Sequence, residues 1–144
     1  MRVSSQALGL PAHICYLIEK AAPLHDIGKI GIPDHIFLKQ GKLTDMEWER
    51  MRNHAQMGAD LLASHESLMV QLAASIALSH HEHWDGNGYP NQLRAASIPI
   101  EGRITAISDV LMRSRHKGHI KKRGRCRKQS NISRVKRERI LILN

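Results

Sequence analysis

Apolar side chains recur at helical spacing along most of the first 110 residues, and this periodicity constrains the possible folds more than any other feature. The clearest stripe comprises Trp48, Met51, Ala55, Gly58, Leu61 and Leu62, and a second comprises Met69, Leu72, Ala73, Ile76 and His80. The alternation that marks a half-buried strand does not recur over a useful length. The sequence therefore predicts an all-α fold.

Local signals indicate where the expected helices begin and end. Residues 12–26 form one apolar-periodic stretch, and its expected end is Gly28, because glycine closes helices well. The pattern Thr44-Asp45-Met46-Glu47 is a capping box, which predicts that the helix carrying the first stripe begins there. A further helix is expected over 67–82, and Pro99 is well placed near the first turn of the last one.

Charge divides the chain near Val110. Residues 1–110 hold 9 Lys/Arg against 12 Asp/Glu, a net charge of −3, whereas residues 111–144 hold 13 Lys/Arg against the single Glu138, a net charge of +12. The second part lacks an apolar stripe until Ile140, and its composition is typical of a disordered segment. We therefore expect one folded domain at 1–110, followed by a disordered basic tail at 111–144.

Composition also restricts the cellular setting. No apolar run approaches the roughly 20 residues of a membrane span, and the chain does not open with a signal-peptide pattern. Two isolated cysteines, Cys15 and Cys126, do not form a disulfide framework and favour a reducing compartment. The expected location is the cytoplasm, with no membrane segment in this chain.

Imidazole and carboxylate side chains cluster at several points on the expected helices. One run holds two adjacent histidines and a loop rich in glycine, His80-His81-Glu82-His83-Trp84-Asp85-Gly86-Asn87-Gly88-Tyr89-Pro90. Upstream lie His25-Asp26 and His54, and Asp109 lies downstream. In an all-α fold such residues can converge on one interior point. Imidazole and carboxylate suit Fe, Mn, Zn or Co, so the sequence predicts a metal-dependent hydrolytic site.

Each of these residues also has an ordinary structural interpretation. His54 alone would fit a hydrogen-bonded core histidine, Asp109 a solvated helix residue and Lys29 a surface lysine. Residues 86–90 alone could form a simple turn. Their joint occurrence in one order favours the functional interpretation.

Five motifs in sequence order carry a resemblance to a known family. They read HDIGKIGIPD, LKQGKLT, MRNHAQMGADLL, ALSHHEHWDGNGYP and IPIEGRITAISDV. This order over residues 8–110 resembles the HD-GYP domain, a branch of the HD phosphohydrolase superfamily. The resemblance implies an HD-type helical bundle that holds two or three divalent metal ions, Fe or Mn, and hydrolyses the phosphodiester of cyclic di-GMP in second-messenger signalling. Hydrolysis of another nucleotide by an HD hydrolase is the alternative within this class.

The resemblance also implies roles for individual residues. By motif position the metal ligands are His25, Asp26, His54, His80, His81 and Asp109. Asp26 and Lys29 are the implied catalytic residues, and Lys29, Gly88, Tyr89 and Pro90 the implied substrate-binding residues. Two loop positions where the family often has glycine are occupied by Gln92 and Ala95.

The family context extends beyond this chain. Members usually carry a regulatory or sensory domain on the N-terminal side, and they take a further Glu and His from a preceding helix. Nothing before His13 can supply those two ligands, so we expect an N-terminally truncated domain.

The tail has a second interpretation that follows from the genetic code. After the motif ending at Val110 the family continues FDALTS.RPYK.AW and later GTHFDP. Permitted codons for Leu111–Gly124 read D-A-L-T-S-Q-R-P-Y-K-E-A-W after a one-base shift, and codons for Glu138–Leu143 read T-H-F-D-P after the same shift. We interpret residues 111–144 as an out-of-frame translation of a normal HD-GYP C-terminus, in which one base of a Phe codon is lost.

Two alternatives remain open for this part of the chain. The tail could be a nucleic-acid arm, because thirteen basic residues bind polyanions non-specifically in a salt-dependent way. It lacks the aromatic residues that stack on bases. The whole chain could also be a non-catalytic remnant or binding module.

Overall fold

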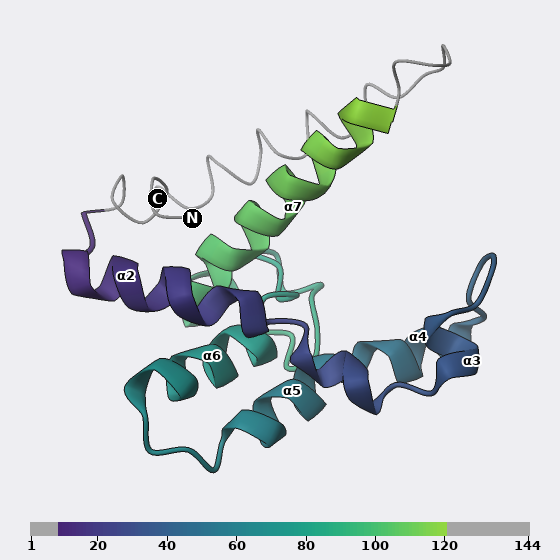
Figure 1. Ribbon diagram of the computed structural model, residues 1–144, viewed down its shortest axis with the longest axis horizontal. Coiled ribbons are helices and arrows are strands. Elements are labelled where there is room, and N and C mark those ends of the chain that lie inside the picture. The colour runs from purple at the N-terminus through teal and green to yellow at the C-terminus, as the bar shows by residue number, and fades with distance from the viewer. Residues whose placement is uncertain (1–8, 121–144) are drawn as a thin grey trace.

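The computed structural model describes residues 9–120, with side chains described as far as Arg113. Within that range the backbone forms helices and loops and no strand, so the predicted all-α fold is confirmed (Figure 1). The longer helices are α2 (Ala12–Ala21), α5 (His54–Leu62), α6 (Leu68–Ser79) and α7 (Ile100–Ile120). The shorter elements are α3 (Asp34–Phe37), α4 (Asp45–Arg52) and the 3₁₀ turns η1 (Ala22–Leu24), η2 (Ile27–Gly31) and η3 (Ala95–Ser97).

Helix α6 is the central element. It contacts α2, α5 and α7, while α3 and α4 project to one side (Figure 1). Ala21, Ala22, Ala73 and Ile76 form a fully buried cluster between α2 and α6. Alanine side chains let helix backbones approach closely, and Leu24, Leu62, Met69 and Leu72 fill the space around the cluster.

Two expected helices differ from the prediction. The helix expected over 12–26 ends at Ala21, because Pro23 cannot continue the hydrogen-bond ladder and lies in η1 instead. The helix expected from Thr44 begins as predicted, with both capping-box bonds formed, but breaks at Asn53 into α4 and α5. His54 therefore becomes the first residue of a new helix rather than part of a continuous stripe.

The later helices agree more closely with the prediction. Helix α6 ends at Ser79, so His80 caps it and His81 follows it. Helix α7 follows Pro99 and runs through Val110 to Ile120, so the change in composition at Val110 does not coincide with a helix end. The rest of the predicted tail, residues 121–144, lies outside the described residues.

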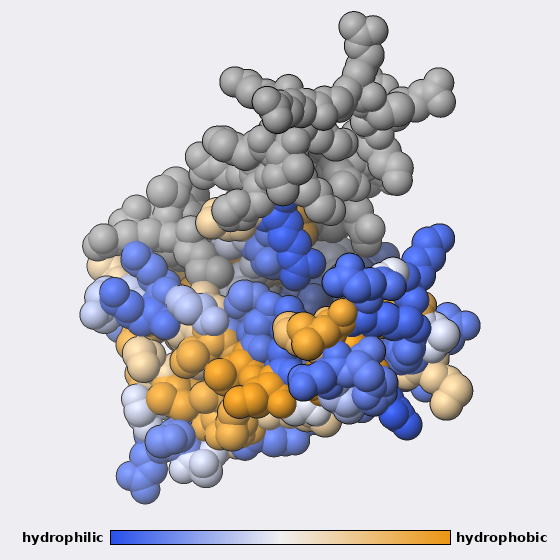
Figure 2. Space-filling view, turned by 45° about the vertical axis from the view of Figure 1, so that its right-hand side comes forward, coloured by the Kyte–Doolittle hydropathy of each residue, from blue (hydrophilic) through white to orange (hydrophobic). Residues whose placement is uncertain are grey.

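Considerable apolar surface remains exposed on the helical body. Figure 2 shows apolar side chains gathered on the face turned to the viewer. Large apolar residues that are more than half exposed include Ile30, Leu38, Met46, Leu61 and Leu68. Between residues 9 and 120, no helix combines the length and the hydropathy needed to cross a bilayer.

Turn η2 packs directly against α5 through two glycines. A side chain added at Gly28 would overlap the His54 carbonyl oxygen and the Gly58 backbone. One added at Gly58 would lie 3.2 Å from the Gly28 nitrogen. The absence of both side chains lets the segment after Asp26 touch the first turns of α5.

Replacing Gly28 with alanine should therefore strain the backbone contact between η2 and α5. We expect Gly28→Ala to lower the free energy of unfolding by about 1–3 kcal/mol, the usual cost of overpacking. Thermal or urea unfolding measures this change. Gly31→Ala is the matched control in the same turn, because its new methyl would meet the flexible Met57 thioether at 2.8 Å. Equal losses in the two variants would contradict the account.

Candidate metal centre

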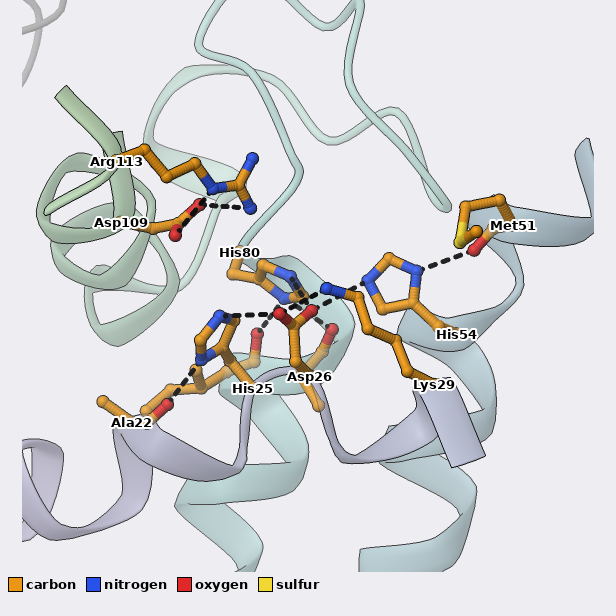
Figure 3. Close-up of polar contacts among 11 residues, drawn as sticks. Ala22, His25, Asp26, Lys29, Met51, His54, His80, Asp109 and Arg113 are labelled. Atoms are coloured by element: carbon orange, nitrogen blue, oxygen red, sulfur yellow. Dashed lines mark hydrogen bonds and ion pairs between the residues drawn. The ribbon is translucent and has the colours of Figure 1, made fainter. Parts of the chain in front are cut away.

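Four side chains converge where three segments of the chain meet. Asp26 lies between η1 and η2, His54 begins α5, and His80 and His81 follow α6. Each offers one ligand atom, and these four atoms lie within 4.8 Å of one another. Figure 3 shows the Asp26 carboxylate between the rings of His25, His54 and His80.

Backbone carbonyls determine the tautomers of two of these histidines. The Nδ1 atom of His54 lies 2.7 Å from the Met51 carbonyl oxygen, and that of His80 lies 2.9 Å from the Ala77 oxygen. A carbonyl oxygen only accepts, so each Nδ1 must carry the hydrogen and donate it. In the neutral ring the Nε2 atom then presents a lone pair, which is how ligating histidines are usually oriented.

Burial keeps these rings neutral. It lowers the pKa of His54 below its ordinary value and that of His80 to about 4. Burial together with the neighbouring His80 and His54 lowers the pKa of His81 to about 2. At neutral pH three uncharged imidazoles therefore surround the Asp26 carboxylate.

Asp26 uses its two oxygens differently. Oδ2 accepts from Lys29 Nζ at 2.5 Å and lies 3.3 Å from His25 Nε2. Although burial alone raises the pKa of Asp26, the hydrogen bonds from His25 and Lys29 outweigh it and hold that pKa below its ordinary value. Oδ1 faces the other way, 3.4 Å from His54 Nε2 and 3.9 Å from His80 Nε2. The carboxylate is thus ionised, with one oxygen directed at two imidazole lone pairs.

This arrangement leaves acceptors facing acceptors. Asp26 Oδ1, His54 Nε2 and His80 Nε2 are buried and have no hydrogen-bond partner among the described residues. Buried polar atoms without a hydrogen-bond partner lower the stability of a fold, and a cation bound between these three acceptors would remove that cost. The donor set of imidazole nitrogen and carboxylate oxygen suits a divalent transition metal. The residues present therefore fit a metal ion.

The structure places the other two predicted ligands at the edge of this group. His25 donates from Nδ1 to the Ala22 carbonyl oxygen at 2.8 Å, and its hydrogen bond to Asp26 raises its pKa. Asp109 on α7 is bound by Arg113 through two contacts of 3.0 and 2.7 Å. Sequence reasoning missed Arg113, although the spacing of four residues on a helix is a recognised ion-pair signal.

The predicted substrate loop lies against the cluster. The Tyr89 ring stacks on His81, with centroids 4.6 Å apart and an interplanar angle of 22°. The Arg52 guanidinium lies 5.3 Å from the centroid of the same Tyr89 ring. Burial raises the pKa of the Tyr89 phenol to about 12. Arg52 was not predicted, because its place beside the loop depends on the helix break at Asn53.

Comparison with known proteins identifies the family. A family model described as HD domain matches residues 1–138. The chain belongs to the HD-domain family. The similarity of its motifs to named cyclic dinucleotide phosphodiesterases makes it an HD-GYP-type member, as the sequence predicts.

Three relatives illustrate the similarity. A cyclic di-GMP phosphodiesterase of Thermotoga maritima is 50% identical over 105 residues, which cover 73% of this chain and 28% of that protein. A cyclic di-GMP phosphodiesterase response regulator of Xanthomonas campestris is 48% identical over 106 residues, 74% of this chain and 28% of its own length. A 3'3'-cGAMP-specific phosphodiesterase of Vibrio cholerae is 49% identical over 102 residues, 71% of this chain and 20% of its own length. The chain thus spans less than a third of the curated relatives it matches.

The buried histidines predict how the stability of the metal-free protein depends on pH. In the folded state His54, His80 and His81 have pKa values below the ordinary histidine value of 6.5, so the unfolded chain binds more protons below that pH. Their stabilising contribution is present above pH 6.5 and is lost as the pH falls, down to about 4 for His80 and about 2 for His81. We expect the Tm in the presence of a chelator to fall over this window.

A histidine variant tests the source of that dependence. His25 opposes it, because its raised pKa adds stability below pH 6.5. His81→Gln removes one buried imidazole and should give a shallower fall in Tm between pH 6.5 and 4.5. Identical slopes for the wild type and the variant would show that the buried rings do not set the dependence.

Proposed function

We propose that this domain hydrolyses the phosphodiester of a cyclic dinucleotide, with cyclic di-GMP as the first candidate substrate and 3'3'-cGAMP as the second. The observation that carries the proposal is the convergence of Asp26, His54, His80 and His81, with three buried acceptor atoms that lack a partner in the described part of the chain. The names of the similar proteins support the substrate class.

The proposed ligands are the six residues predicted from the motifs. Asp26, His54, His80 and His81 would hold the first ion, and His25 and Asp109 would complete a site for two or three ions, Fe or Mn. When bound, such ions supply Lewis-acid chemistry, which makes water a stronger nucleophile at neutral pH and stabilises charge on phosphate oxygens. The backbone carbonyls of Met51 and Ala77 keep the imidazole lone pairs directed into the site.

Lys29 and the loop would bind the substrate. The Lys29 ammonium lies beside Asp26 at the edge of the cluster, where a compact cation can reach a phosphate oxygen. Gly88, Tyr89 and Pro90 would line the site beside His81, on which the Tyr89 ring stacks, and that ring would contact a nucleotide base. Arg52 behind that ring adds a second cation for the anionic substrate.

Hydrolysis of cyclic di-GMP by the Mn²⁺- or Fe²⁺-loaded protein tests this function. We expect turnover that a chelator abolishes. The kcat/KM of Asp26→Asn should fall at least a hundredfold, because Asp26 is the carboxylate of the four-residue cluster. The kcat/KM of Lys29→Gln should fall less, mainly through a higher KM. Product formation is followed by chromatography. Lys42→Gln, which changes an exposed lysine in the loop before α4, is the matched control. Metal-independent turnover, or full activity in Asp26→Asn, would overturn the proposal.

The ion pair between Asp109 and Arg113 favours a second candidate function, a metal-binding domain with little or no turnover. Both oxygens of a proposed ligand are held by a guanidinium. Arg113 belongs to the segment that we propose to be translated out of frame, and the restored frame places alanine at that position. We also propose that residues 1–110 form the domain, that the frame changes after Val110, and that a regulatory domain lies outside this chain. Resequencing of the gene across codon 110 tests the frame change.

Removing Arg113 should make Asp109 available to a metal ion. The pair is partly solvent-exposed, and such pairs contribute about 0.2–1 kcal/mol, so we expect Arg113→Ala to bind Mn²⁺ about two- to fivefold more tightly. Equilibrium dialysis measures the affinity, with Arg50→Ala as an exposed-arginine control. In an Asp109→Asn background the Arg113 change should have no effect. A gain that persists in that background would mean that Arg113 acts by general charge repulsion rather than through Asp109.

A further inference from the structure

We propose that Glu82 positions the loop between Trp84 and Leu93, and with it the Tyr89 ring, against the metal cluster. Glu82 is a positioning residue rather than a ligand, because both of its oxygens are engaged by the loop backbone. Only the expected change in KM rests on the proposed function. The role of Glu82 in holding the loop can be tested without substrate.

The carboxylate of Glu82 is buried, with 5% of the residue exposed. Its Oε1 accepts from the Asn91 backbone N–H at 2.7 Å, and its Oε2 accepts from the Leu93 backbone N–H at 3.0 Å. Hydrogen bonds to a charged acceptor are stronger than neutral ones, and burial shields them from water. The Glu82 side chain therefore holds the backbone at two positions, nine and eleven residues further along the chain.

Glu82 holds a loop whose backbone is strained. Gln92 lies between the two bonded residues and has a φ of 54°, and Ala95, which follows the loop as the first residue of η3, has a φ of 51°. This left-handed region is costly for residues other than glycine, and such residues persist where their surroundings determine the conformation. The two hydrogen bonds that Glu82 accepts lie on either side of Gln92, and the Ala95 N–H donates to the Trp84 carbonyl oxygen at 3.0 Å. The conformation of the loop therefore depends on contacts made by Glu82, which precedes it, and by Trp84, where it begins.

Further contacts of the same loop place Tyr89 over the cluster. Gly88 packs so closely on the backbone of Glu82 and His83 that an added side chain would overlap it. The next residue donates its N–H to the His81 carbonyl oxygen at 3.3 Å, and the Tyr89 ring stacks on the His81 ring. Glu82 immediately follows His81, so one short segment carries a proposed ligand and the anchor of the loop that covers it.

The Glu82→Gln substitution removes the charge of the side chain while keeping its size and shape. Its amide has one oxygen to accept with, and its NH₂ group would face a backbone N–H, so at least one of the two bonds is lost and two donors oppose each other. The four atoms of the metal cluster are not altered by this change. We therefore expect a local effect on the loop with metal binding retained.

Hydrogen exchange and kinetics on Glu82→Gln test the proposal. The amides of Asn91 and Leu93 should exchange about tenfold faster or more, as expected for the loss of a hydrogen bond to a charged group, while those of α5 and α6 keep their wild-type protection. Mn²⁺ affinity should stay within about twofold of wild type. For cyclic di-GMP the KM should rise severalfold with a smaller change in kcat.

Two further variants complete the design. Glu101→Gln is the matched control, a partly buried carboxylate outside the loop that accepts from Ser75 Oγ at 2.6 Å, and it should leave the Asn91 and Leu93 amides unchanged. Glu82→Asp keeps the charge and should give an intermediate effect, so it carries the test if the glutamine variant does not fold.

Unchanged exchange at Asn91 and Leu93 in Glu82→Gln would overturn the proposal. Loss of protection throughout α5 and α6 together with loss of Mn²⁺ binding would also overturn it, because it would show a general structural role. If the wild type does not hydrolyse cyclic dinucleotides, the proposed function fails while the exchange result still decides the role of Glu82.

Discussion

The backbone contact between Gly28 and α5 is the constraint on which the site depends. Because neither Gly28 nor Gly58 has a side chain, η2 lies directly against the start of α5. That contact brings the segment containing Asp26 and Lys29 to His54, which the helix break at Asn53 has placed at the first position of α5. Helix α6 packs on α5 and on η1, the turn before Asp26, and it ends at Ser79, directly before His80 and His81.

The electrostatics of the cluster follow from this packing. Helix-end carbonyls hold the Nδ1 hydrogens of His54 and His80, and burial keeps the rings uncharged. Their Nε2 lone pairs face an Asp26 oxygen that remains ionised because Lys29 and His25 stabilise the other oxygen of the same carboxylate. A polypeptide gains nothing from such opposed acceptors unless a cation joins them, and this is the physical argument for a metal centre.

Much of this arrangement could be predicted from the sequence because it depends on local patterns and on motif order. Helical periodicity gave the all-α class, the capping box at Thr44 was confirmed in both of its bonds, and the motifs indicated the four clustered residues. The helix break at Asn53 could not be predicted, since the apolar stripe continues across it and only tertiary packing reveals that Trp48 is half exposed while Ala55 is buried.

The roles of charged residues were the hardest to predict. Glu82 lay inside the most informative motif, yet its partners are backbone amides nine and eleven residues away, and backbone donors carry no sequence signal. Arg113 and Asp109 have helical ion-pair spacing, but the consequence of that pair depends on where α7 lies relative to the cluster.

Anomalous diffraction at the manganese edge, from crystals of the Mn²⁺-loaded protein, tests the central claim most directly. The account predicts a peak at coordination distance from Asp26 Oδ1 and from the Nε2 atoms of His54 and His80, with His81 beside it. A loaded crystal with manganese peaks only elsewhere, or with direct hydrogen bonds joining those three atoms to other protein groups, would contradict it.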